Sequence, residues 1–180
     1  MRRILLFCVG LLSPFLVHAV EVTSLPTSSN VPGGVAIIET AMTATQGHYR
    51  DDKIMLVEFE GAQYAVIGIP LNAALGEHSL ILENADGNQV TRYFTVKDKL
   101  YVEQRLTITN QRQENPNNDD MVRINRESAE MNRAFSSWDE TLQPVFTMRP
   151  PVEGVRSSSF GLKRFFNEQP RAPHSGMDIA

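Results

Sequence analysis

The chain has 180 residues, of which 42% are hydrophobic and 21% charged, with 17 basic and 21 acidic side chains. This composition can form a packed core, so general disorder is disfavoured, and the length fits one domain plus part of another. The sequence contains no basic stripe with interleaved aromatic residues, which argues against a nucleic acid as partner.

Residues 1–19 have the pattern of a secretory signal peptide. Arg2 and Arg3 are followed by an apolar run from Ile4 to Val17, and Val17-His18-Ala19 is a suitable cleavage site. A membrane anchor is the alternative, but the apolar run is short for a membrane span. We therefore predict an exported protein of the periplasm or cell envelope, with no transmembrane segment after removal of the signal.

The only cysteine, Cys8, lies in this signal segment and would be removed with it. The exported chain would then have no disulfide framework and no thiolate ligand for zinc. Loss of Arg2 and Arg3 would leave 15 of the 17 basic residues against 21 acidic ones. Such a chain has to be stabilised by burial of a core.

Residues 20–110 have the pattern of a small antiparallel β-sandwich, immunoglobulin-like in architecture only, because the cysteines and tryptophan of an antibody core are absent. Asn84–Asn88 contains the Asp-Gly signal of a tight hairpin, and Gln46-Gly47-His48 is predicted to be a turn. The predicted strands are Val35–Glu39, Lys53–Phe59, Tyr64–Ile69, His78–Glu83 and Gln89–Val96, and Lys97–Asn110 is expected to continue as a strand.

Residues 111–151 are predicted to be a linker that contains a helix at about 119–138. Asn118 or Asp119 is the expected cap, and Thr141–Pro151 is an extended, proline-containing connector. An apolar stripe is expected to pack on one of the two domains, because it is too short for a coiled coil. The stripe consists of Met121, Ile124, Met131 and Phe135.

The last residues contain a histidine and a carboxylate four positions apart, His174 and Asp178, with Gly176 between them. Both side chains are donors that Zn²⁺ accepts at about 2.0–2.2 Å. The glycine is expected to let the backbone turn where a Cβ would resist. The spacing alone also fits an ordinary surface loop.

The segment before this pair adds evidence for a metal site. Residues 154–180 resemble the start of the catalytic domain of LytM-type, lysostaphin-like zinc metallopeptidases, through the runs Ser157-Ser158-Ser159-Phe160-Gly161 and Pro170-Arg171-Ala172-Pro173-His174. Residues 152–180 are accordingly predicted to begin an incomplete β-rich peptidase domain. The runs Pro32–Val35 and Val66–Leu71 are similar to an amino-terminal β-domain of some exported members. The resemblance implies that His174 and Asp178 are the first two Zn²⁺ ligands.

In that family the third ligand and the catalytic base come from a later H-x-H pair, which this sequence lacks. The base is therefore expected beyond Ala180, and no catalytic residue is predicted within the chain. His48 and His78 are interpreted as ordinary turn and strand-edge residues rather than as the missing ligand. We predict that the chain as given binds Zn²⁺ poorly and does not hydrolyse peptide bonds.

Asn167 and Arg171 are candidates for substrate binding, since the family places an asparagine near the groove and a guanidinium suits a carboxylate. Arg164 could act in the same way. The alternative for both arginines is a structural bond to backbone or to Asp178.

The fold class predicted is mainly β. The resemblance implies an exported metalloendopeptidase that cleaves peptide cross-links of peptidoglycan by zinc-activated water. A non-catalytic LytM-like protein that binds the wall or activates an amidase is the alternative. Such relatives typically lose zinc ligands, so the presence of both His174 and Asp178 favours the enzyme.

Overall fold

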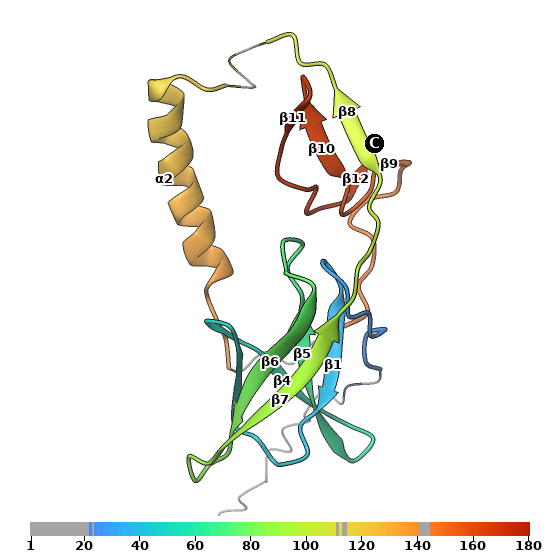
Figure 1. The fold of residues 1–180 in the computed structure, drawn as a ribbon, viewed down its shortest axis with the longest axis vertical. Helices are drawn as coiled ribbons and strands as arrows, with labels where there is room; N and C mark the ends of the chain where they lie inside the picture. Colours follow the sequence, from blue (N-terminus) through green and yellow to red (C-terminus); the bar gives the residue numbers. More distant parts are fainter. Residues whose placement is uncertain (1–21, 23, 111, 113–114, 141–144) are drawn as a thin grey trace, which may run out of the picture.

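The structure is a computed structural model, and it describes residues 22, 24–110, 112, 115–140 and 145–180 (Figure 1). The predicted signal peptide, residues 1–19, lies outside this part of the chain. Within it the protein is mainly β, as the sequence predicted. No helix among the described residues is both long and apolar enough to cross a membrane.

One sheet of the sandwich has three antiparallel strands in the order β1-β5-β4. The bounds are Val35–Glu39 for β1, Met55–Phe59 for β4 and Ala62–Gly68 for β5. Glu60 and Gly61 join β4 to β5 with φ values of 50° and 81°. Two successive positive φ angles are those of the tight turn that matches the twist of a hairpin.

The other sheet has four antiparallel strands in the order β3-β2-β6-β7. Its long hairpin, β6-β7, turns at Gly87 with φ of 80°, as the Asp-Gly signal indicates. The bounds are Gln46–Tyr49 for β2, Asp52–Lys53 for β3, Gly76–Glu83 for β6 and Gln89–Val96 for β7.

Side chains from both sheets form one buried cluster. The alternation of buried and exposed residues in β6 and β7 follows from the two-residue period of a strand, which turns every second side chain inward. Its least exposed apolar members are Ala36, Ala65, Ile67, Leu80, Leu82 and Val96.

The predicted turn at Gln46-Gly47-His48 is wrong, because these residues form β2 and pair with β6. The reason lies in the core. A Cβ on Gly47 would come within 2.9 Å of Ile54 Cγ1 and 3.0 Å of Leu82 Cδ2. The glycine therefore allows two apolar side chains to approach the strand backbone, and it marks a close contact rather than a chain reversal.

Helix α2 spans Asn118–Phe135, and its N-cap is Asn117 rather than the predicted Asn118 or Asp119. Asn117 Oδ1 accepts from the Asp120 amide at 2.9 Å, and the Asp120 carboxylate accepts from the Asn117 amide at 3.4 Å. This reciprocal pair is a capping box and fixes the start of the helix. The helix ends three residues before the predicted Trp138.

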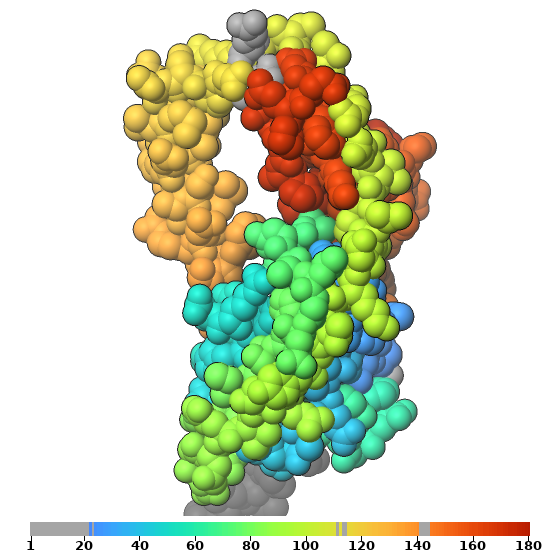
Figure 2. Space-filling view, in the orientation of Figure 1, coloured from blue at the N-terminus to red at the C-terminus, as the bar shows by residue number. Residues whose placement is uncertain are grey.

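The prediction that the apolar stripe of α2 packs on a domain is also wrong. None of the residues of α2 is buried, and Met131 and Phe135 are 53% and 84% exposed. Figures 1 and 2 show the helix standing away from the strands with an open gap beside it. Polar pairs hold the chain on both sides of the helix. Arg112, before the helix, pairs with Asp120 of its first turn, and Glu140, after the helix, pairs with Lys53 of β3.

The remaining strands form a separate group in space, around the C-terminus of the chain (Figure 1). β8 pairs in parallel with β10, β10 pairs with β11, and β9 pairs with β12. The bounds are Glu103–Leu106 for β8, Arg156–Ser158 for β9, Lys163–Phe166 for β10, Gln169–Pro170 for β11 and Asp178–Ile179 for β12.

The strand predicted for Lys97–Asn110 is thus confined to β8. The sequence places this stretch in the sandwich domain, but within the described residues β8 pairs with β10 of the last segment. Parallel pairing between distant segments leaves no local pattern, and for this reason the sequence did not indicate it.

Candidate metal centre

The backbone around His174 is fixed by two hydrogen bonds to the turn before β10. The His174 amide donates to the Leu162 carbonyl at 3.0 Å, and the Gly161 amide donates to the His174 carbonyl at 2.7 Å. The residue is 7% exposed. His174 therefore lies in an ordered loop, although the loop itself has no regular secondary structure.

The imidazole of His174 is oriented through its Nδ1 atom. This nitrogen lies 2.9 Å from the Ser159 carbonyl oxygen and 3.3 Å from Ser158 Oγ. A carbonyl oxygen only accepts hydrogen bonds, so in that contact Nδ1 carries the proton and donates. In the neutral ring the other nitrogen, Nε2, then has the lone pair. This arrangement is the usual one for a histidine that binds a metal through Nε2.

Nε2 faces Asp178, whose Oδ1 lies 3.2 Å from it. Two ligands at zinc distances of about 2.0–2.1 Å and a tetrahedral angle are about 3.3 Å apart. The two atoms therefore fit a shared Zn²⁺ ion in both donor type and spacing. Asp178 reaches this place from β12, which pairs with Ser158 of β9.

Gly176 has a different role from the one predicted. It is not among the glycines with positive φ, so the backbone does not demand glycine at this position. A Cβ there would lie 3.6 Å from His174 Nε2, which is ordinary contact. A side chain at this position would therefore begin in contact with that nitrogen.

A third protein ligand is not brought to the pair within the described residues, where no group of three or more His, Cys, Asp or Glu is placed to hold a metal. His78 uses both ring nitrogens inside the sandwich. Nε2 lies 2.9 Å from the Ala74 carbonyl, and Nδ1 lies 2.7 Å from the Tyr49 hydroxyl. His48 lies in β2 of the same sheet, so neither histidine completes the site.

Asn167 is engaged with the backbone of the segment that follows β8. Its φ is 46°, its Oδ1 accepts from the Ile108 amide at 2.9 Å, and its Nδ2 donates to the Ile108 carbonyl at 3.0 Å. This two-point contact holds the turn between β10 and β11. Its role in substrate binding stays a prediction.

The two arginines differ in what they contact. Arg171 donates from Nη2 to Gln169 Oε1 at 3.1 Å and lies 5.9 Å from the Phe166 ring centroid. Arg164 instead points toward the prospective ligands, with Nη2 3.8 Å from Asp178 Oδ2. For Arg171 a substrate contact stays a prediction, whereas Arg164 has the structural contact to Asp178 that was its alternative.

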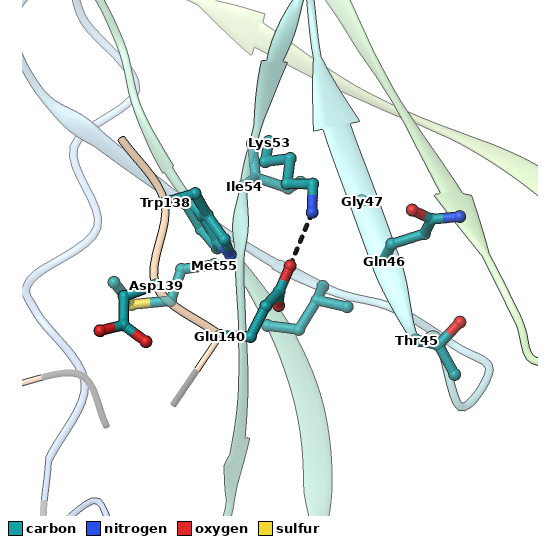
Figure 3. Close-up of a pocket in the computed structure, with 10 residues that line it drawn as sticks. Thr45, Gln46, Gly47, Lys53, Ile54, Met55, Trp138, Asp139 and Glu140 are labelled. Atoms are coloured by element: carbon teal, nitrogen blue, oxygen red, sulfur yellow. Dashed lines mark hydrogen bonds and ion pairs between the residues drawn. The ribbon is translucent and has the colours of Figure 1, made fainter. Parts of the chain in front are cut away.

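A polar hollow of about 480 Å³ lies elsewhere, between the sandwich and the residues after α2 (Figure 3). Lys53 Nζ donates to Glu140 Oε1 at 2.6 Å across it, and this bond, with a smaller contribution from Trp138, lowers the pKa of the Glu140 carboxyl. Neither His174 nor Asp178 lines the hollow. It is therefore separate from the prospective metal pair.

Known proteins show where this architecture recurs. The model of the peptidase family M23 N-terminal domain matches residues 28–99. A crystal structure of a candidate M23 peptidase from Pseudomonas aeruginosa is similar over 74% of this chain, with 28% identity and a TM-score of 0.59. That match covers 52% of the other chain, so the present chain spans about half the length of this relative.

A glucan-utilisation protein of Bacteroides ovatus, SGBP-B in complex with a mixed-linkage heptasaccharide, matches 47% of this chain and 24% of its own. Its identity is 22% and its TM-score is 0.30, which is too low to support an inference. No curated protein matches the chain. The family match and the Pseudomonas structure agree with the sandwich described above, and residues 28–99 are similar to the N-terminal domain of peptidase family M23.

Proposed function

We propose that this chain is part of an exported M23-type metallopeptidase that cleaves peptide cross-links in peptidoglycan. His174 and Asp178 would supply two ligands of a Zn²⁺ ion. The observation that carries the proposal is the 3.2 Å approach of Nε2 to Oδ1, with Nδ1 already bound to the Ser159 carbonyl. The family match of residues 28–99 supports the peptidase class.

The residues of the chain would prepare the site in two ways. Backbone bonds from Gly161 and to Leu162 hold the His174 loop, and the Ser159 carbonyl orients the imidazole so that Nε2 faces Asp178. Pairing of β12 with β9 brings the Asp178 carboxylate to the same point. When bound, Zn²⁺ supplies Lewis-acid chemistry, which polarises a carbonyl and lowers the pKa of a coordinated water.

The ligand assignment is tested by Zn²⁺ titration calorimetry on the whole chain. We expect weak binding by the wild type and loss of that binding in His174→Ala and in Asp178→Ala. The matched controls are His48→Gln and Asp86→Asn, which remove an imidazole and a carboxylate at positions distant in sequence from His174 and Asp178. Equal Zn²⁺ uptake by all five proteins would contradict the assignment.

The reaction is tested with purified peptidoglycan and added Zn²⁺. We expect no release of peptide fragments by this chain, because two protein ligands are fewer than the three of a catalytic zinc site. A longer form that supplies a further histidine is expected to release them, and to lose that activity on His174→Ala. Turnover by the present chain would contradict the prediction of inactivity.

The alternative is a non-catalytic LytM-like protein that binds the wall or activates an amidase. It is distinguished by cosedimentation with peptidoglycan. Retention on the wall that is unchanged by a chelator and by His174→Ala, together with no cleavage by the longer form, would support wall binding over the enzyme.

A further inference from the structure

We propose that Arg164, held in place by Gln104, is a positioning residue that directs the Asp178 carboxylate toward His174. This inference rests on the proposed function, since it concerns how the prospective Zn²⁺ pair is oriented. It concerns a contact that joins the segment before α2 to the segment that carries the ligands.

The contact starts from the parallel pairing of β8 with β10, in which Gln104 and Arg164 are register partners. Register partners project to the same face of a sheet, so their side chains lie side by side. Arg164 Nε donates to Gln104 Oε1 at 3.3 Å. This bond ties the guanidinium to β8.

The other end of the same guanidinium faces Asp178. Arg164 Nη2 lies 3.8 Å from Oδ2, while Oδ1 of the same carboxylate lies 3.2 Å from His174 Nε2. A guanidinium is a planar group that donates in several fixed directions, so it can bind Gln104 on one edge and attract a carboxylate with another. An ammonium group on a flexible stem has no such fixed fork.

Asp178 needs an external partner because little else restricts its side chain. The side chain is 54% exposed, and β12 is two residues long with an irregular register against β9. The Arg164 side chain is 27% exposed, so the attraction is less screened than that of a fully solvated pair. With Oδ2 attracted to Arg164, the carboxylate keeps Oδ1 turned to His174.

A different role for Arg164 predicts the opposite result. If its charge only competes with a cation for Asp178, removing that charge strengthens Zn²⁺ binding. If it positions the carboxylate, removing it weakens binding. Loss of an outer partner of a metal ligand typically costs about 10- to 100-fold in metal affinity.

The test measures the Zn²⁺ dissociation constant of the whole chain by calorimetry. We expect Arg164→Gln and Gln104→Met each to weaken binding by about tenfold. Gln104→Met is the cleaner variant because it leaves the charge unchanged. The double variant is expected to be no weaker than Arg164→Gln alone, since Gln104 acts through Arg164. Gln104→Glu keeps the acceptor and should bind at least as tightly as the wild type.

Lys163→Gln is the matched control, because it removes a positive charge from the adjacent position of β10, on the opposite face of the strand. It should not weaken binding. Arg164→Gln that binds Zn²⁺ as tightly as the wild type, or more tightly, would overturn the positioning role. His174→Ala that keeps the wild-type affinity would overturn the proposed function instead.

A second readout needs no metal. In crystals of Gln104→Met and Arg164→Gln we expect the separation of His174 Nε2 and Asp178 Oδ1 to exceed the 3.2 Å of the wild type, with β8 and β10 still paired. An unchanged separation in both variants would also overturn the inference. This measurement decides the question even if the affinity of the two-ligand site is too weak to titrate.

Discussion

The sandwich and the C-terminal strands, β8 to β12 without α2, are stabilised by different interactions. All the buried apolar side chains of the described residues lie between Ala36 and Val96. In the C-terminal strands and the loops between them, the buried residues are Ser158, Gly161 and His174. They contribute polar groups and a glycine but no apolar core. Their order comes from short ladders and from backbone bonds around the His174 loop.

This difference shows where chemistry can be placed in such a chain. A core of aliphatic side chains gives stability that does not depend on a ligand. A region held by polar contacts has little stability of its own, and residues that open easily are common at ligand sites. The prospective metal pair lies in that second region, and the sandwich gives the chain a stable anchor beside it.

The largest effect is expected in the sandwich core. Leu82→Ala removes a side chain that is 0% exposed, and the cavity should lower the free energy of unfolding by about 2–5 kcal/mol. Urea denaturation followed by circular dichroism measures it. Ile81→Ala is the control on the opposite face of β6, where the side chain is 45% exposed, and it should cost about 0.5 kcal/mol or less. Equal losses would contradict the description of the core.

A smaller, local effect is expected from Gly161→Ala. Gly161 has φ of 86°, and a Cβ there would lie 1.9 Å from Tyr101 Cε1. The substitution should expose the His174 loop, seen as faster hydrogen exchange at Gly161 and faster tryptic cleavage after Arg164. The midpoint of sandwich unfolding should stay unchanged, because Gly161 is outside that core.

Gly87→Ala is the control for this variant. Its φ is 80° and a Cβ would meet nothing within 4 Å, so it has the backbone strain of about 1–2 kcal/mol without the clash. If Gly161→Ala opened the His174 loop no more than Gly87→Ala does, the close packing of Tyr101 on Gly161 would be unimportant.

The smallest effect is expected at the start of α2, outside both regions. Asp120 accepts from Arg112 Nε and Nη2 at 2.6 and 2.7 Å, and this bond, with a smaller one from the Asn117 amide, lowers the pKa of the Asp120 carboxyl. A lowered folded-state pKa means that the stabilisation is complete above the ordinary aspartate pKa of about 3.9. It is lost as the pH falls through the folded-state value.

Circular dichroism at 222 nm should therefore show loss of helix below about pH 4. Arg112→Gln should shift this loss toward the ordinary aspartate pKa, and high salt should weaken the difference because the pair is exposed. A helix signal with the same pH midpoint in the wild type and in Arg112→Gln would show that the pair does not hold the helix start.

The sequence predicts elements well where the signal is local. β1 and β7 have the bounds that their apolar and alternating patterns indicate, and the hairpin at Gly87 follows from its Asp-Gly pair. It fails where the cause is tertiary. Gly47 looks like a turn residue, but it is required by Ile54 and Leu82 from other parts of the core.

In the candidate site, too, the sequence indicates some features and not others. The His174 and Asp178 pair is visible in the sequence because the two residues are four positions apart, and the structure places them together. The Ser159 carbonyl is invisible because every residue has one. The contribution of Gln104 depends on β8 pairing with a strand that follows sixty residues later, and nothing in the local sequence indicates that.

The parallel pairing of β8 with β10 also changes the meaning of α2. Parallel neighbours cannot be joined by a tight turn, so the chain has to leave the pair at one end and return at the other. Residues 107–162 make that crossover, and α2 is its most regular part. The helix is therefore part of the connection between two paired C-terminal strands, and it lies beside the sandwich. With no buried residue of its own, it is the natural place to splice in a label or a guest domain while the strands on either side keep their register.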